Sequence, residues 1–478
     1  MTTTLNELDD DTLIWIFSAL SIPDIQALRR VCRRLWYISI QHAVWLNACK
    51  AHILQENIPF PSRPLCSLCS RELERLTVRA YHLGRNWRAP NTRLRLLRTV
   101  PSSTGAIEEI KFLATGGKTW IITISRGIWS DLYLWDCDAM QLVGHWSPGR
   151  ALFDGMVTNS DQSSAAVIAI CVKHSSYSVV EILSIISDVD LCQVSFCPIT
   201  TLQTRYKPVT LRGDIIALSD HDSETLIMNW KTGNQYLLCS PDTWQDKPLH
   251  VTFAGGHVFV VRARSVCIFA EPPFARPDDE TAVNLPHSYT SFGWVDGVSL
   301  SVGPVVRYAE KDPPFLSLLV RTKGDDPWSL KDQFQFFTVG SSLPTESSIG
   351  LPGETSLTDS LPLPRLALSS SLTCPNRGPL RCSDMVLGRY GSAAWVLPAD
   401  RSIAGLISEH VHLQTVPVPT SNQTLIIAAF PGPLSSEAQV KASIENEEGS
   451  SWSCLDYDEE HGLIALGSST GDINIFSL

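Results

Sequence analysis

Apolar residues in the first 54 positions recur with the spacing of amphipathic helices. Within 9–20 they fall at the i, i+3, i+4, i+7 positions of one helix face, after three aspartates suited to a cap and a first turn. A second pattern opens at Ser21 and runs to about residue 39, and a third covers 41–54. The chain therefore begins with three predicted helices. Their apolar positions are Leu13, Ile16, Phe17 and Leu20; then Ile25, Leu28, Val31, Cys32, Leu35 and Trp36; then Val44, Trp45 and Leu46.

This helical unit carries more apolar surface than it can bury alone. A unit below about 50 residues has too much surface for its volume and seldom folds without a disulfide, a metal or a partner. Ile14 and Trp15, moreover, point away from the stripe that their neighbours share. The excess predicts a docking partner. The alternative is that the helices pack only on the rest of the chain.

Residues 8–46 resemble an F-box, the small helical module that grips the Skp adaptor of cullin-based ubiquitin ligases. The resemblance is carried by an opening leucine, an Ile-Phe pair, an Ile-Pro-Asp turn, the segment VCRRL and a late tryptophan. It implies that a set of residues is divided between the core of the module and contacts with the adaptor. This set is Leu8, Asp9, Leu13, Ile16, Phe17, Leu20, Ile22, Pro23, Leu28, Val31, Cys32, Leu35, Trp36 and Trp45.

One position departs from the family pattern. The family usually has proline directly after the opening leucine, where this chain has Asp9. An aspartate there is a capping residue of different chemistry. The resemblance implies a substrate receptor of a Skp–cullin–F-box ligase, with a cullin reached through the adaptor and an unknown target protein. The alternative is a non-catalytic scaffold for protein-complex assembly without a ubiquitin role.

Residues 51–91 are expected to link this module, residues 1–50, to the rest of the chain. Within them 69–88 has the pattern of a helix, with early glutamates and late arginines that suit the helix dipole. Its apolar side is Leu73, Leu76, Ala80, Leu83 and Trp87. A packed helix would hold two domains at a fixed distance, as a flexible tether would not.

Two other interpretations of the linker stay open. Eight arginines between 71 and 98 make this the basic region of the chain, so a phosphate-binding face is an alternative to a solvated flank. Cys49, His52, Cys66 and Cys69 have spacings found in zinc sites, although prolines stiffen the segment between the two pairs. The simpler interpretation is free thiols, with no cofactor or metal.

From residue 92 the chain has short β-patterned runs that recur in seven pairs, separated by turn residues. Trp135, Ile182, Trp230 and Phe269 repeat at intervals typical of a propeller blade. The first pair contains Trp135-Asp136 followed by Gly144-His145, and 463–476 is similar to a final hairpin; both resemble WD-repeat proteins. The predicted fold is thus multidomain: an all-α module with a linker helix, then an all-β propeller of about seven blades, residues 92–478.

Ring closure gives a specific prediction. The last pair ends at Leu478 without a run that could form an outer strand, whereas the run 93–100 is unassigned. We expect 93–100 to pair beside the last blade, which would cover two strand edges. Residues 341–380 are expected to be a disordered insertion, because 22 of these 40 positions are Ser, Thr, Pro or Gly. A phosphorylatable regulatory loop is the functional alternative.

Composition restricts the function further. The net charge of −11 argues against a nucleic-acid or membrane binder, and the acidity lies beyond residue 100. The chain has neither a long apolar run nor a signal-like amino terminus, and its 13 cysteines form no short disulfide framework. We expect a cytoplasmic or nuclear protein. No metalloprotease, hydrolase, Walker A or dinucleotide motif occurs, so we expect no enzyme.

Overall fold

The structure is a computed structural model of the 478-residue chain. It describes residues 7–101, 105–115, 118–188, 193–220, 224–239, 246–272, 282–303, 316–322, 331–340, 364–375, 382–398, 422–447 and 450–478.

The amino-terminal module is helical, as predicted, but it contains one more helix than expected. Its elements are α1 (Asp10–Ser18), α2 (Ile22–Leu28), α3 (Arg33–Ser39), α4 (His42–Cys49), the π-helical turn η2 (Lys50–Leu54), the short turn η3 (Leu65–Ser67) and α5 (Ser70–Arg88). The single helix expected from Ser21 to about residue 39 is wrong, because the chain breaks between α2 and α3.

The break has a visible cause. Arg29 follows α2 and turns inward, where it donates to the Ser39 hydroxyl at 2.9 Å and pairs with Glu74 on α5 at 2.6 Å. Cys32 then has an extended backbone and acts as the N-cap of α3. This turn rotates α3 out of line with α2, so Val31, Cys32 and Trp36 leave the stripe that contains the buried Ile25.

The rest of the chain forms seven antiparallel sheets of the propeller type, each running from an inner to an outer strand. Blade one contains β2 (Ala106–Thr115), β3 (Lys118–Arg126), β4 (Ser130–Asp136) and β5 (Gln141–Trp146). Blade two contains β6 (Leu152–Thr158), β7 (Ile168–Lys173), β8 (Ser178–Asp188) and β9 (Gln193–Gln203). Blade three contains β10 (Lys207–Arg212), β11 (Ile215–Ser219), β12 (Thr225–Asn229) and β13 (Gln235–Leu238), followed by the additional parallel strand β17 (Ala282–Asn284).

Blades four to seven continue the same pattern. Blade four contains β14 (Pro248–Ala254), β15 (His257–Arg262), β16 (Ser265–Ala270) and β18 (Ser288–Ser291). Blade five contains β19 (Val295–Val302), β20 (Leu316–Thr322), β21 (Lys331–Gly340) and β22 (Arg365–Pro375). Blade six contains β23 (Met385–Leu387), β24 (Ser392–Leu397), β25 (Thr424–Ala429) and β26 (Gln439–Glu445). Blade seven contains β27 (Trp452–Asp458), β28 (Leu463–Ser468), β29 (Asp472–Ser477) and β1 (Arg95–Pro101).

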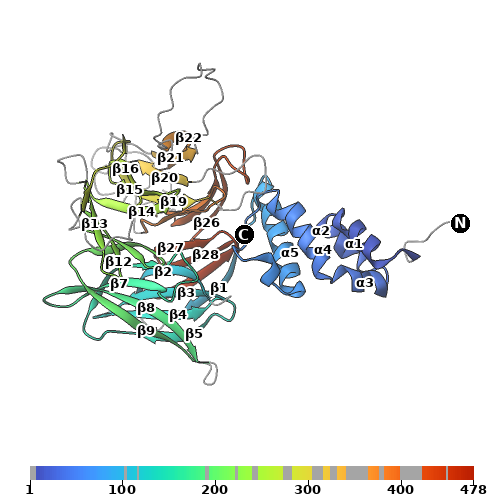
Figure 1. Ribbon diagram of the computed structural model, residues 1–478, viewed down its shortest axis with the longest axis horizontal. Coiled ribbons are helices and arrows are strands. Elements are labelled where there is room, and N and C mark those ends of the chain that lie inside the picture. Colours follow the sequence, from blue (N-terminus) through green and yellow to red (C-terminus); the bar gives the residue numbers. More distant parts are fainter. Residues whose placement is uncertain are drawn as a thin grey trace, which may run out of the picture.

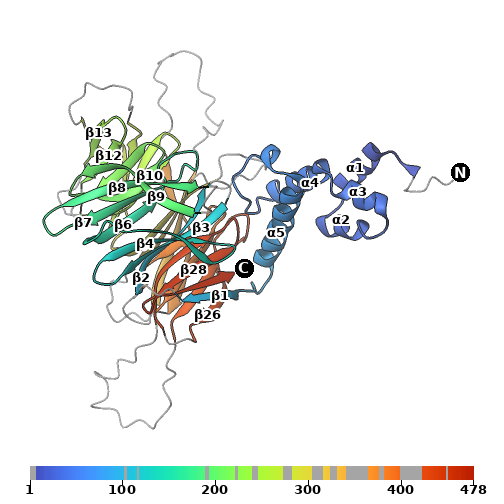
Figure 2. The ribbon, with the colours of Figure 1, turned by 90° about the horizontal axis from the view of Figure 1, so that it is seen from below.

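The predicted ring closure is confirmed. β1 pairs antiparallel with the carboxyl-terminal β29, from Arg95 opposite Ser477 to Pro101 opposite Asp472. Figures 1 and 2 show the C-terminus beside β1 and α5. One blade is therefore built from both ends of the propeller domain, and the edge of β29 is covered.

The expected insertion at 341–380 is partly wrong. Residues 365–375 form β22, which pairs with β21 along its whole length. A strand that adds to an existing sheet edge gains backbone hydrogen bonds without needing a core of its own. This explains why its Ser-rich composition misled the prediction. Residues 341–363 and 376–380 lie outside the described residues.

The propeller has two faces, which we name by the direction of the inner strands. The distal face is the one where inner strands begin, and the helix face is the one where they end. The turn after the inner strand β27 contacts α5, so α5 lies at the face where the inner strands end, which gives this face its name. In Figures 1 and 2 the helices project to one side of the propeller, with α1 and α3 farthest from it.

Candidate functional site

Helix α5 belongs to two hydrophobic cores at once. Its first half places Leu73, Leu76 and Ala80 in the core of the helical module, among the buried side chains of α1 to α4. Its second half places Leu83 and Trp87 in the core between blades six and seven. All five of these predicted positions are buried. A helix shared in this way fixes the module relative to the propeller.

Polar contacts reinforce this junction. Arg79 donates to the carbonyl of His461 at 2.7 Å, and Ser62 donates to Glu460 at 3.0 Å. The turn that contains these acceptors also closes tightly on α5. A Cβ on Gly462 would lie 2.6 Å from Leu83 Cδ1, and the residue has a φ of +59°. Glycine is therefore required at this turn for both space and backbone conformation.

The end of α5 leads directly into the closing strand. The Asn86 side chain accepts from the Arg93 backbone N–H at 2.9 Å and donates to the Arg93 carbonyl at 3.0 Å. The Thr92 N–H donates to the carbonyl of Lys441 on β26 at 3.3 Å. The segment between α5 and β1 is thus held at both ends, which agrees with a spacer of fixed length.

A buried carboxylate lies beneath this junction. Glu459, 6% exposed, accepts from the Tyr390 N–H at 3.2 Å and from the Ser392 hydroxyl at 2.5 Å. A Cβ on Gly388 would lie 2.2 Å from Glu459 Cδ, so only glycine leaves room for the carboxylate. Burial raises the pKa of Glu459 to about 7.

This pKa predicts a pH dependence of stability. The folded-state pKa of Glu459 lies above the ordinary value of 4.5. The stabilisation that the protonated side chain contributes to the folded state is therefore fully present below pH 4.5 and is lost as the pH rises through 7. The loss is on the order of 3 kcal/mol in the free energy of unfolding. Urea titrations at pH 5.0 and 7.5 should show a smaller loss for Glu459→Gln than for the wild type. Equal losses in both proteins would contradict this assignment.

The structure sorts the predicted adaptor-binding residues by exposure. Five are buried in the module core, namely Leu13, Phe17, Ile22, Leu35 and Trp45. Four are partly buried, namely Leu8, Ile16, Leu20 and Leu28. Five are exposed, namely Asp9, Pro23, Val31, Cys32 and Trp36. The buried five maintain the fold, and the other nine have surface available to a partner.

Large apolar side chains are exposed on the module itself. We call the following four residues the docking set: Trp15, 79% exposed; Val31, 68%; Tyr37, 57%; and Trp36, 50%. Trp15 lies on α1, and Trp36 and Tyr37 lie on α3. The helices α1 and α3 pack against each other. An ion pair of 2.8 Å between Arg34 and Asp10 joins the two helices. The sequence pattern indicated Trp15 by its outward position, whereas Tyr37 was missed.

The distal face carries a second group of exposed aromatic residues. Trp129, on the turn after β3, is 43% exposed, and Trp294, on the loop before β19, is 56% exposed. The guanidinium of Arg264 lies 3.7 Å from the centre of the Trp294 ring. On blade two, His174 stacks on Tyr177 with ring centres 4.6 Å apart. Exposed aromatic and arginine side chains are the residue types that dominate protein interfaces.

The zinc alternative has no geometric support in the described part of the chain. Cys49 is buried in the module core, and burial raises the pKa of its thiol to about 11, whereas Cys66 and Cys69 are exposed. Among the described residues, no three His, Cys or carboxylate side chains are placed to hold a metal ion.

The arginines of the linker, which suggested a phosphate-binding face, partly form ion pairs within the chain. Arg88 pairs with Glu56 at 3.1 Å, and Arg63 pairs with Glu72 at 2.9 Å.

Comparisons with known proteins add a likeness of fold. No protein-family model and no curated protein sequence matches the chain. Among solved structures, the chain is similar to the β-propeller domain of Cps50 (Swd1) from Myceliophteria thermophila. The TM-score is 0.47 at 10% sequence identity, over 81% of this chain and 100% of that domain. In the residues described here, no helix is both long and apolar enough to cross a membrane. The strand pairing of the chain itself establishes a small helical module followed by a seven-bladed β-propeller.

Proposed function

We propose that this protein is the substrate receptor of a Skp–cullin–F-box ubiquitin ligase. In this role the helical module docks on a Skp-family adaptor, and the propeller binds a target protein. The observation that carries the proposal is the docking set, four large apolar side chains exposed on α1, on α3 and in the turn before α3. Exposed apolar side chains of this size favour association with another polypeptide. The ordered F-box resemblance of residues 8–46 supports the identity of that partner.

The mechanism that we propose is proximity. α5 contributes to both cores, so a target on the propeller would be held at a fixed position relative to the adaptor. Holding two reactants on one assembly raises their effective concentration into the mM range for short connections. The ligase partners would supply the chemistry, and no residue of this chain is required as a catalyst. This role places the protein in the cytoplasm or the nucleus.

A scaffold without a ubiquitin role is the second candidate. The observation that favours it is Asp9, which is exposed at the N-cap of α1 where the family usually has proline. In this role the propeller would assemble other proteins, and the module would contribute a different contact.

Co-purification distinguishes the two candidates. Full-length tagged protein expressed in cells should retain both a Skp-family adaptor and a cullin, identified by mass spectrometry. The matched control is Trp15→Asp with Trp36→Asp, which changes the docking set and leaves the propeller unaltered. Retention of other proteins by both forms, with neither adaptor nor cullin in either eluate, would favour the scaffold and contradict the receptor.

A further inference from the structure

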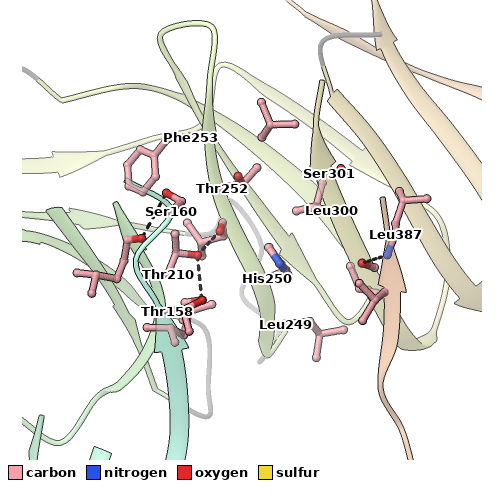
Figure 3. A pocket seen from close by; sticks show the side chains of 18 of the residues that line it. Thr158, Ser160, Thr210, Leu249, His250, Thr252, Phe253, Leu300, Ser301 and Leu387 are labelled. Carbon is pink, nitrogen blue, oxygen red and sulfur yellow. Dashed lines mark hydrogen bonds between the residues drawn. The ribbon is translucent and has the colours of Figure 1, made fainter. Parts of the chain in front are cut away.

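The seven inner strands surround a cavity of about 950 Å³ along the propeller axis. Every blade contributes to its wall, from Glu109 on blade one to Asp456 on blade seven. Figure 3 shows side chains of this wall, with His250 near the middle of the view. The volume is within the range of sites that bind small ligands or single side chains. The cavity therefore has room for part of a bound polypeptide.

The charged groups of the wall are unbalanced. Two carboxylates of the wall are neutralised: Glu271 pairs with Arg212 at 3.3 Å, and Asp296 pairs at 2.6 Å with the buried Arg321, which does not line the cavity. A third cation, Arg389, pairs outside the cavity with Glu460 at 3.6 Å. Among the described residues that line the cavity, Glu109, Asp384 and Asp456 then remain, together with the single cation Lys111. When ionised, these three carboxylates exceed the one ammonium group.

Two of the three carboxylates, Asp456 and Asp384, are held in place by backbone groups of neighbouring blades. Asp456 accepts from the Phe112 N–H at 2.6 Å, and Asp384 accepts from the Leu455 N–H at 3.0 Å. Glu109 lies near the backbone N–H of Met156 on blade two, which lowers the pKa of this carboxyl group. Because Asp456 and Asp384 each join two blades, neither can turn away from the cavity without breaking a contact in the ring. These two negative groups are thus fixed around the axis.

The positive charge of Lys111 does not fully compensate the three carboxylates. Lys111 Nζ lies 3.8 Å from Asp456 Oδ1, beyond hydrogen-bond distance. The pKa of Glu109 is raised to about 7, because burial and the neighbouring Asp384 and Asp456 together outweigh the opposing effect of Lys111. Burial likewise raises the pKa of Asp456. A second cation placed among these groups would stabilise their ionised forms.

A buried polar atom without a hydrogen-bond partner also lies at the cavity. His250 Nδ1 is buried and makes no hydrogen bond, and burial lowers the pKa of this imidazole to about 4, so the ring is neutral near pH 7. The side chain of Ser301, a residue that is only 8% exposed, also lines the cavity. A buried polar group without a partner costs free energy, which a polar ligand would recover.

The position of these groups indicates the direction of entry. Asp384 precedes β23, and Glu109 and His250 lie in the first half of β2 and β14, so these three are near the distal face, whereas Asp456 and Ser301 lie deeper, in the second half of β27 and β19. The helices contact the opposite face, through Arg79 and His461. A ligand reaching the carboxylates from the distal face would also pass the exposed aromatic residues of that face.

We propose that this cavity, called the channel below, receives a basic side chain, arginine or lysine, of the polypeptide that binds the distal face. The proposal rests on the proposed function only in taking the ligand to be a protein. Residues 101–478 carry the whole negative excess of the chain, which favours a basic partner. The cation would lie among Glu109, Asp384 and Asp456, and its remaining donors would reach His250 or Ser301.

Binding of three tripeptides to the full-length chain tests this proposal. The probes are acetyl-Gly-Arg-Gly-amide, its lysine counterpart and its citrulline counterpart, a neutral isostere of arginine, each titrated by ligand-observed NMR. The arginine or the lysine peptide should bind at least about tenfold more tightly than the citrulline peptide, as expected for a charged group among carboxylates. Glu109→Gln with Asp384→Asn should remove this preference, whereas Asp131→Asn, outside the channel, should preserve it.

Lys111→Gln gives a change in the opposite direction. Removing the resident cation should tighten binding of the basic peptide, which a folding defect would not do. The proposal is overturned if charged and neutral peptides bind equally or not at all, or if the preference survives the double substitution. Adaptor retention should be the same in all channel variants, so failure here is distinguishable from failure of the receptor role.

Discussion

Trp36→Asp is expected to abolish adaptor capture by the full-length protein. The Trp36 side chain is half exposed and lies outside the module core, so a charge there should remove an apolar contact without unfolding the module. A central interface tryptophan contributes about 2 kcal/mol or more, so affinity should fall at least about thirtyfold. The measurement is a titration of purified Skp adaptor against immobilised protein.

The matched control for this substitution is on the propeller. Ile128→Asp changes a side chain that is 85% exposed on the turn after β3, and it should leave adaptor affinity unchanged. Circular dichroism of both variants should match the wild type. An unchanged affinity for folded Trp36→Asp would exclude the docking set as the adaptor-binding surface.

Trp87→Ala is expected to separate the module from the propeller. The Trp87 indole is fully buried at the end of α5, in the core shared by blades six and seven. Truncation of a buried tryptophan costs about 3–5 kcal/mol, because it removes apolar contact and leaves a cavity. Urea unfolding should show a loss of this size for the propeller transition, and limited proteolysis should cut the segment between α5 and β1 faster.

An exposed tryptophan is the reference for this second prediction. Trp129→Ala, on the distal face, should change the free energy of unfolding by no more than about 0.5 kcal/mol, as is usual for surface positions. If Trp87→Ala were as stable and as resistant to protease as Trp129→Ala, α5 would not be the element that fixes the two domains.

The sequence predicted the elements that follow from the spacing of apolar residues and from the number of strands each blade needs. The blade period is visible in Trp135, Ile182, Trp230 and Phe269, which all lie in or directly after the third strand of a blade. The unpaired run at 93–100 identified the closing strand because the last blade lacked an outer one. The apolar side of α5 followed from helix periodicity alone.

The features that it missed depend on contacts between distant residues. The break after α2 requires the pairing of Arg29 with Glu74, 45 positions away. β22 has a Ser-rich sequence and forms because β21 offers an edge, and β17 adds in parallel to β13 for the same reason. The division of the F-box residues into core and surface depends on the rotation of α3, which periodicity within one helix does not reveal. The carboxylates of the channel come from three blades, so no local motif could bring them together.

Hydrogen exchange of the full-length protein, with and without purified Skp adaptor, tests the central claim most directly. The account predicts slower exchange of backbone amides in α1 and across 29–39 when adaptor is present, with unchanged exchange in α5 and the seven blades. Unchanged exchange throughout the helical module at saturating adaptor, or protection confined to the propeller, would contradict it.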